Sequence, residues 1–244
     1  MRVIVTGGAS GIGAAIAARL VDDGASVVVL DRDIAKIPDG TYGLEADVTD
    51  DASVRAAVAE AAARLGGLDT VVANAGIGAA GSVLENSDDD WHAVYDVNVV
   101  GIVRVVRAAL PHLVAAEGAS IVTTCSIAAT AGLPQRALYS ATKGAVAALT
   151  RAMAADHLRE GIRVNCVSPG TADTPWVSRL LEAADDPVAE RAALNARQPH
   201  GRLVAPEEVA AAVAYLVDPA AASTTGTVLP VDGGMDALRL RPVA

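Results

Sequence analysis

The sequence contains few aromatic residues, few cysteines and an excess of acidic over basic residues. Phenylalanine is absent and aromatic residues make up 2% of the 244 positions, so the core must be built from alanine, valine, leucine and isoleucine. Lys and Arg total 19 against 29 Asp and Glu, which gives a formal net charge of −10. Because this charge repels phosphate backbones and anionic lipids, neither nucleic acid nor membrane is expected as a partner.

Cysteine and histidine are also too sparse for several kinds of site. Cys125 and Cys166 form no C-x-x-C pair, and each falls in an apolar run that predicts a strand. Two buried, reduced thiols are therefore expected, which favours a cytoplasmic location. The four histidines lack the spacing of metal ligands, so no metal is expected. No segment is expected to be long and uncharged enough to span a bilayer.

Apolar, β-branched runs alternate along the chain with segments of helical periodicity. The predicted strands are 2–6, 26–31, 41–46, 68–73, 119–125, 162–168 and 227–231. The predicted helices are 11–23, 51–65, 101–116, 137–160 and 206–217. This alternation, with wholly apolar strands, predicts one α/β domain over residues 1–244: a Rossmann-type, doubly wound parallel sheet of seven strands with helices on both faces.

The first predicted strand runs directly into a glycine-rich turn and then a helix. Gly7, Gly11 and Gly13 would let the backbone approach a pyrophosphate at the positive end of that helix. The spacing is G-x-x-x-G-x-G, which differs from the commonest dinucleotide fingerprint. A glycine turn without a ligand is the simpler interpretation, but the strand and the helix lie where a dinucleotide-binding motif needs them.

The residue that ends the second predicted strand bears on the choice of cofactor. A carboxylate at Asp31 can bind the ribose hydroxyls of adenosine and would repel a 2′-phosphate, which predicts NAD. The neighbouring Arg32 could instead attract that phosphate. With an uncharged Ser10 inside the glycine loop, Asp31 carries more weight than Arg32.

Three residues in the middle of the chain have the spacing of an acid–base site. Tyr139 and Lys143 are four apart and share one face of a predicted helix. The ammonium can then favour the phenolate, which makes the tyrosine a competent general acid or base. Ser126 follows a predicted strand, and its hydroxyl could hold the oxygen that the tyrosine protonates. Alone, a Tyr-x-x-x-Lys pair is a common feature of helix surfaces; here it accompanies the glycine loop.

Together these motifs resemble the short-chain dehydrogenase/reductase family, from Arg2 to about Asp236. Other matching segments are Asp47-Val48, Asn74-Ala75-Gly76, Asn98-Val99-Val100-Gly101, Pro169-Gly170-Thr171 and Asp232-Gly233-Gly234. The resemblance implies hydride transfer with Asn98, Ser126, Tyr139 and Lys143 as catalytic residues. It implies cofactor contacts from Gly7, Ser10, Gly11, Ile12, Gly13, Asp31, Arg32, Asp47, Val48, Asn74, Ala75, Gly76, Tyr139, Lys143, Pro169, Gly170, Thr171 and Thr174.

The segment 171–205 departs from the alternating pattern and is expected to form a lid over the substrate. Two short helices are predicted in it, at 175–184 and 187–196. It carries four arginines, and Arg136 stands just before Tyr139. Arginines grouped near one pocket of an acidic chain suggest an anionic ligand. Any one of them could equally be a solvated surface residue or pair with a nearby carboxylate.

The lid sequence resembles family members that oxidise 2-keto-3-deoxy sugar acids and 3-hydroxybutyrate. In that branch, arginines at the positions of Arg136, Arg179 and Arg197 face a substrate carboxylate. We therefore expect an NAD-dependent dehydrogenase acting on a small hydroxy acid. Two alternatives stay open: a 3-oxoacyl carrier-protein or xenobiotic ketone reductase using NADPH, and a catalytically silent binding protein on the same fold.

The resemblance also bears on assembly. Relatives pair the helices that match 101–116 and 137–160 across a two-fold axis. The first of these is apolar around more of its circumference than one contact with a sheet requires. A homotetramer is expected.

Overall fold

The computed structural model describes residues 1–182 and 184–241, and its centre is one parallel sheet of seven strands. These are β1 (Arg2–Thr6), β2 (Ser26–Asp31), β3 (Tyr42–Glu45), β4 (Thr70–Ala73), β5 (Ser120–Thr124), β6 (Arg163–Pro169) and β7 (Val228–Val231). Their order across the sheet is β3-β2-β1-β4-β5-β6-β7. The predicted single-domain, doubly wound fold is confirmed, and every strand end lies within two residues of its predicted position.

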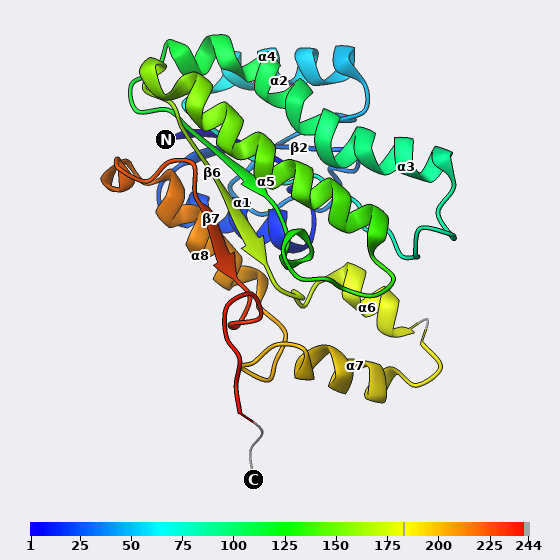
Figure 1. Cartoon of the computed structure of the whole chain (residues 1–244). Helices are drawn as coiled ribbons and strands as arrows, with labels where there is room; N and C mark the ends of the chain where they lie inside the picture. Colours follow the sequence, from blue (N-terminus) through cyan, green and yellow to red (C-terminus); the bar gives the residue numbers. More distant parts are fainter. Residues whose placement is uncertain (183, 242–244) are drawn as a thin grey trace.

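Helices cover both faces of this sheet (Figure 1). One face carries α1 (Gly11–Asp22) and α8 (Pro206–Val217); the other carries α2 (Asp51–Leu65), α4 (Gly101–Val114) and α5 (Ala137–His157). Because side chains alternate along a strand, Val3 and Val5 of β1 pack under α1 and α8, whereas Ile4 packs on the opposite side. Both layers are built from alanine and branched aliphatic residues, as the composition predicts.

The chain order of the strands reverses at β1 and β4, which lie side by side although β2 and β3 separate them in sequence. In a sheet of this kind, the helices that follow the two central strands depart to opposite faces. A crevice is left at the carboxyl ends of the strands. The glycine loop after β1 and the segment after β4 therefore face each other across that crevice.

A long helical rod, which the sequence analysis recognised only in part, runs along one side of the sheet. It consists of α3 (Asp88–Tyr95), a π-helical turn (Asp96–Val100) and α4. The sequence carried a start signal for α3: Ser87 and Asp90 form a reciprocal capping box. The acidic first turn hid the helical periodicity that the analysis relied on.

This rod corrects the expectation that no segment could span a bilayer. Residues 88–114 form 27 residues of helix, and an 18-residue window within them has a mean hydropathy of 1.5, so the helix is long and apolar enough for a span. The apolar residues Ile102, Val105, Val106, Ala109 and Leu113 are buried in the protein core. Packing inside the protein thus accounts for much of the apolar character of the rod.

The lid is a compact extension beyond the carboxyl end of β6 (Figure 1). Its helices are α6 (Pro175–Glu182) and α7 (Pro187–Ala196). The predicted first helix, 175–184, runs past α6, and residue 183 lies outside the described residues. A small apolar cluster of Val177, Leu181, Leu194 and Leu203 holds the lid together. A parallel bridge between Ala172 and Val204 joins its two ends, so the lid is a closed loop with its own core.

Candidate active site

A cleft of about 770 Å³ opens at the carboxyl ends of the strands, a size typical of ligand sites. It is lined by every residue that the sequence analysis named as a cofactor contact. Ser126, Tyr139 and Lys143 line it too, as do the arginines 136, 179 and 197. Asn98 is the exception: it is fully buried behind the cleft wall.

The glycine loop lies at one end of the cleft, and its glycines are required by geometry. Gly7 and Gly11 have φ values of 65° and 54°, which side-chain-bearing residues rarely adopt. A Cβ at Gly13 would collide with the carbonyl oxygen of Gly7. The Ser10 hydroxyl stands at the N-cap of α1 but makes no capping hydrogen bond. The first N–H groups of α1 are thus left for a ligand, and the loop fits the pyrophosphate of a dinucleotide.

Asp31 is fixed at the end of β2 by the backbone of this loop. Its Oδ2 atom accepts a 3.0 Å hydrogen bond from the N–H of Ala9, and its Oδ1 atom accepts one of 3.3 Å from Asp33. The carboxylate lines the cleft, and so does the neighbouring Arg32. Further along the wall, two hydrogen bonds from Thr49 lower the pKa of Asp47 and keep it ionised.

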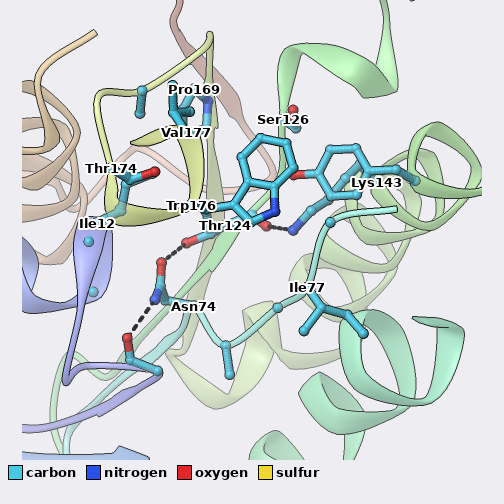
Figure 2. Close-up of a pocket in the computed structure, with 18 of the residues that line it drawn as sticks. Ile12, Asn74, Ile77, Thr124, Ser126, Lys143, Pro169, Thr174, Trp176 and Val177 are labelled. Atoms are coloured by element: carbon cyan, nitrogen blue, oxygen red, sulfur yellow. Dashed lines mark hydrogen bonds between the residues drawn. The ribbon is translucent and has the colours of Figure 1, made fainter. Parts of the chain in front are cut away.

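Asn74, at the end of β4, joins three strands at the floor of the cleft. Its amide nitrogen donates to the carbonyl oxygens of Thr6 and Gly7, at 3.2 and 3.3 Å. Its Oδ1 atom accepts a 3.1 Å hydrogen bond from the hydroxyl of Thr124 (Figure 2). The glycine loop and the strand that leads to Ser126 are therefore held in register through one side chain.

The predicted acid–base residues converge on the opposite end of the cleft. Ser126 follows β5, whereas Tyr139 and Lys143 lie on the first turns of α5. The Nζ atom of Lys143 donates a 2.8 Å hydrogen bond to the carbonyl oxygen of Thr124 and lies 5.6 Å from the centroid of the Tyr139 ring. Lys143 is 4% exposed, so its ammonium is nearly buried. This arrangement can transfer a proton at an oxygen held between the serine and the tyrosine.

The side chain of Asn98 lies behind the cleft surface and contacts the cleft wall through hydrogen bonds. The π-helical turn places its side chain against Ile77, where Oδ1 accepts from the backbone N–H at 2.8 Å. Its amide nitrogen donates to the carbonyl oxygen of Ile77 at 2.9 Å and to the hydroxyl of Thr142 at 3.1 Å. Asn98 therefore ties the segment after β4 to α5, beside Lys143.

The arginines near the lid fall into two groups. Arg191 pairs with Asp173 at 2.6 Å, and Arg202 pairs with Glu208 at 2.7 Å. Arg136, Arg179 and Arg197 line the cleft, and none of them forms an ion pair with a carboxylate anywhere in residues 1–182 or 184–241. The three arginines named from the sequence thus line the cleft without a carboxylate partner among the described residues, and Arg136 donates one hydrogen bond to the carbonyl oxygen of Gln135.

The apolar side chains at the lid end of the cleft were not predicted from the sequence. These are Ile77, Leu133, Trp176, Val177, Leu180 and Leu194. A tryptophan in an otherwise aromatic-poor lid was the available signal. The two cysteines, in contrast, are buried and free, as predicted. Among the described residues, no group of three His, Cys, Asp or Glu side chains could hold a metal ion.

Comparison with known proteins places this site in a family. A family model described as enoyl-(acyl carrier protein) reductase matches residues 7–236. The chain is 43% identical to cis-4-hydroxycyclohexanecarboxylate dehydrogenase of Sinomonas cyclohexanicum, over 96% of each chain. It is 40% identical to meso-2,3-butanediol dehydrogenase of Serratia marcescens, over 96% of this chain and 94% of that one.

Solved structures of two ketoreductases are also similar to this chain. An actinorhodin polyketide ketoreductase with NADPH is similar with a TM-score of 0.91 and 32% identity, over 97% of both chains. A 3-ketoacyl-(acyl-carrier-protein) reductase from Brucella melitensis with NADH has a TM-score of 0.87 and 32% identity, over 96% of this chain and 97% of that one. The family uses nicotinamide cofactors, and the chain belongs to the short-chain dehydrogenase/reductase family of oxidoreductases.

Proposed function

We propose that this enzyme transfers a hydride between NAD and a secondary alcohol of a small hydroxy acid. One observation carries the choice of substrate: Arg136, Arg179 and Arg197 line the cleft that contains Ser126 and Tyr139, and within the described residues none of them pairs with a carboxylate. Unpaired guanidinium groups beside a pocket favour a carboxylate, which they can bind by charge-assisted hydrogen bonds. A relative at 43% identity is named for a hydroxy acid, which supports the same substrate class.

In the oxidation direction, Tyr139 removes the proton of the substrate hydroxyl as a phenolate. Ser126 donates a hydrogen bond to the same oxygen as it becomes a carbonyl. The Nζ atom of Lys143 lies 5.6 Å from the centroid of the Tyr139 ring. Only one of its N–H donors is used on Thr124, so the others are left for ribose hydroxyls. A bound nicotinamide supplies the hydride chemistry, while the chain supplies orientation and proton transfer.

Asn98 holds the segments that carry these residues in place through buried hydrogen bonds. Both hydrogens of its side-chain amide are donated to Ile77 and Thr142, so the side chain positions the cleft wall and α5. The ordering of a water for proton release, expected from the family resemblance, stays a prediction.

The preference for NAD is supported by Asp31. Its carboxylate is held at the end of β2, where the adenosine ribose of a dinucleotide on the glycine loop would lie. A negative charge there binds ribose hydroxyls and repels a 2′-phosphate. The remaining cofactor contacts and the lid at 171–205 are proposed with the roles that the resemblance implies. We further propose a homotetramer in the cytoplasm.

A second function, reduction of a 3-oxoacyl carrier-protein thioester or another ketone, is favoured by the similarity to a 3-ketoacyl-(acyl-carrier-protein) reductase and by Arg32 in the cleft lining. The two are separated by one screen. The purified enzyme is given NAD or NADP with hydroxy acids and neutral alcohols, and NADH or NADPH with 3-oxoacyl thioesters. The proposal expects fastest turnover of a hydroxy acid with NAD. Fastest reduction of a thioester with NADPH would favour the alternative.

A further inference from the structure

The lid end of the cleft has a chemical character that neither the family nor the arginines specify. The lid residues that line it are Thr171, Ala172, Thr174, Pro175, Trp176, Val177, Arg179, Leu180, Leu194 and Arg197. Two arginines and two threonines in this set are proposed to contact the substrate or the cofactor. All the other side chains in the set are hydrophobic. Leu133 and Ile77 extend the apolar surface on the opposite wall.

Trp176 is the largest of these side chains and reaches the opposite wall of the cleft. A Cβ at Gly78 would lie 2.9 Å from Cζ2 and 3.0 Å from Cε2 of Trp176, so the indole rests against the glycine backbone of the segment after β4. Figure 2 shows this indole among the pocket residues, between Thr174 on the lid and Lys143. The side chain is nevertheless 41% exposed, which leaves apolar ring surface facing the cleft and its entrance.

Arg136 is joined to the same indole. Its guanidinium carbon lies 5.9 Å from the centroid of the Trp176 ring, within reach of a cation–π interaction. The backbone before it is constrained as well: Gln135 has a φ of 57°, and a bridge ties Arg136 to Gly81. One positive group and one apolar plane are thus held together beside Ser126 and Tyr139.

We infer that the cleft selects a hydroxy acid with an apolar carbon skeleton, and that Trp176 sets the size of the skeleton it admits. The inference rests on the proposed function and narrows its substrate class. A polyhydroxylated sugar acid would bring several hydroxyls against Leu180, Leu194 and the ring carbons of Trp176. These groups offer no hydrogen-bond partner apart from the single indole N–H, so most of the hydroxyls would be left unpaired. An alicyclic or branched aliphatic acid would bury its skeleton there and present its carboxylate to the arginines.

The kinetic test compares acids that share a carboxylate but differ in skeleton. We expect kcat/KM for 3-hydroxybutyrate or cis-4-hydroxycyclohexanecarboxylate to exceed that for gluconate by about 10- to 100-fold, the range in which apolar pockets discriminate. Trp176→Ala should lower kcat/KM for these acids and raise it for a bulkier one, 3-hydroxy-3-phenylpropionate, whereas Trp176→Phe should lie between. Gluconate as the best substrate, or an equal effect of Trp176→Ala on every acid, would overturn the inference.

A binding test keeps the inference separate from the proposed reaction. The chain has two tryptophans, and Trp91 stacks on Tyr95 in α3, so a Trp91→Phe protein reports on Trp176 alone. With NAD present, cyclohexanecarboxylate should change the fluorescence emission of Trp176 in this variant, and gluconate should not. A response to cyclohexanecarboxylate without turnover of any alcohol would refute the proposed function but support the inference. Turnover of hydroxy acids with no such response, or with an equal response to gluconate, would refute the inference alone.

Discussion

The ammonium group of Lys143, in α5, donates a 2.8 Å hydrogen bond to the carbonyl oxygen of Thr124, which lies 19 residues earlier in the chain at the end of β5. This bond fixes the start of α5 against the strand end that carries Ser126. The distance between the two groups that must share one substrate oxygen is therefore set by the fold and not by the substrate.

Tyr139→Phe should abolish turnover and leave NADH affinity nearly unchanged, because only the oxygen that transfers the proton is lost. Lys143→Ala should lower both turnover and NADH affinity, since the ammonium is hydrogen-bonded to β5 and is proposed to act on the tyrosine and on the cofactor ribose. Fluorescence titration of NADH and steady-state kinetics measure the two effects. Appreciable activity of Tyr139→Phe would show that another group is the acid–base catalyst.

NAD should be preferred over NADP because of the charge on Asp31. Asp31→Asn keeps an acceptor for the N–H of Ala9 and removes the negative charge. It should therefore lower the ratio of kcat/KM with NAD to kcat/KM with NADP without loosening the glycine loop. Asp31→Ala should lower this ratio too, with some loss of affinity for both cofactors. The claim is wrong if the unmodified enzyme is equally or more efficient with NADP.

The protein should be a homotetramer in solution. Apolar residues that α4 does not bury in the core, such as the half-buried Val103 and the exposed Val114, could be covered by a second copy of the chain. Sedimentation velocity at micromolar concentration measures the state directly. A stable monomer would contradict the prediction.

Stability in acid should depend on Glu208. Hydrogen bonds from Arg202 and from the N–H of Ala205 lower its pKa from 4.5 to about 2. A pKa depressed in the folded state adds stability that is present above pH 4.5 and is lost as the pH falls toward 2. Glu208→Gln keeps a side-chain acceptor for the N–H of Ala205 but removes the charge. Its deficit in unfolding free energy should be about 1 kcal/mol or less, since both side chains are exposed, and should shrink below pH 4.5. A deficit independent of pH would contradict this.

The fold could be predicted because its strands are wholly apolar and its motifs lie at strand ends. Ser126, Tyr139 and Asp31 needed no more than local spacing to be placed at one edge of a sheet. Asn98 could be named but not located, since the π-helical turn that buries it leaves no periodic signal. Its partners, Ile77 and Thr142, are distant in sequence.

Which arginines of the lid face the cleft could not be predicted from the composition and spacing of the sequence alone. Arg191 and Arg197 lie on the same short segment and are equivalent by composition. Only the packing of the lid brings Asp173 within 2.6 Å of Arg191 and leaves Arg197 facing the cleft. Trp176 was overlooked for the same reason: nothing in the sequence indicates that a lid residue reaches Gly78 on the opposite wall.

The three unpaired arginines are the central evidence for the substrate class, and single substitutions test them. Charge-assisted hydrogen bonds contribute about 1.5–3 kcal/mol each, so Arg136→Met or Arg197→Met should lower kcat/KM by roughly 10- to 150-fold for an acid substrate. The loss should be much smaller for a neutral alcohol of similar size. Arg191→Met, at an arginine that is paired with Asp173, is the matched control and should have little effect.

The most direct measurement is the rate of NADH formation from a hydroxy acid and from its methyl ester, with the unmodified enzyme and Arg136→Met. Faster turnover of the acid, with the difference largely lost in Arg136→Met, is the result that the account predicts. Equal turnover of acid and ester, unchanged by the substitution, would show that the arginines are surface residues and that the substrate is not selected by its carboxylate.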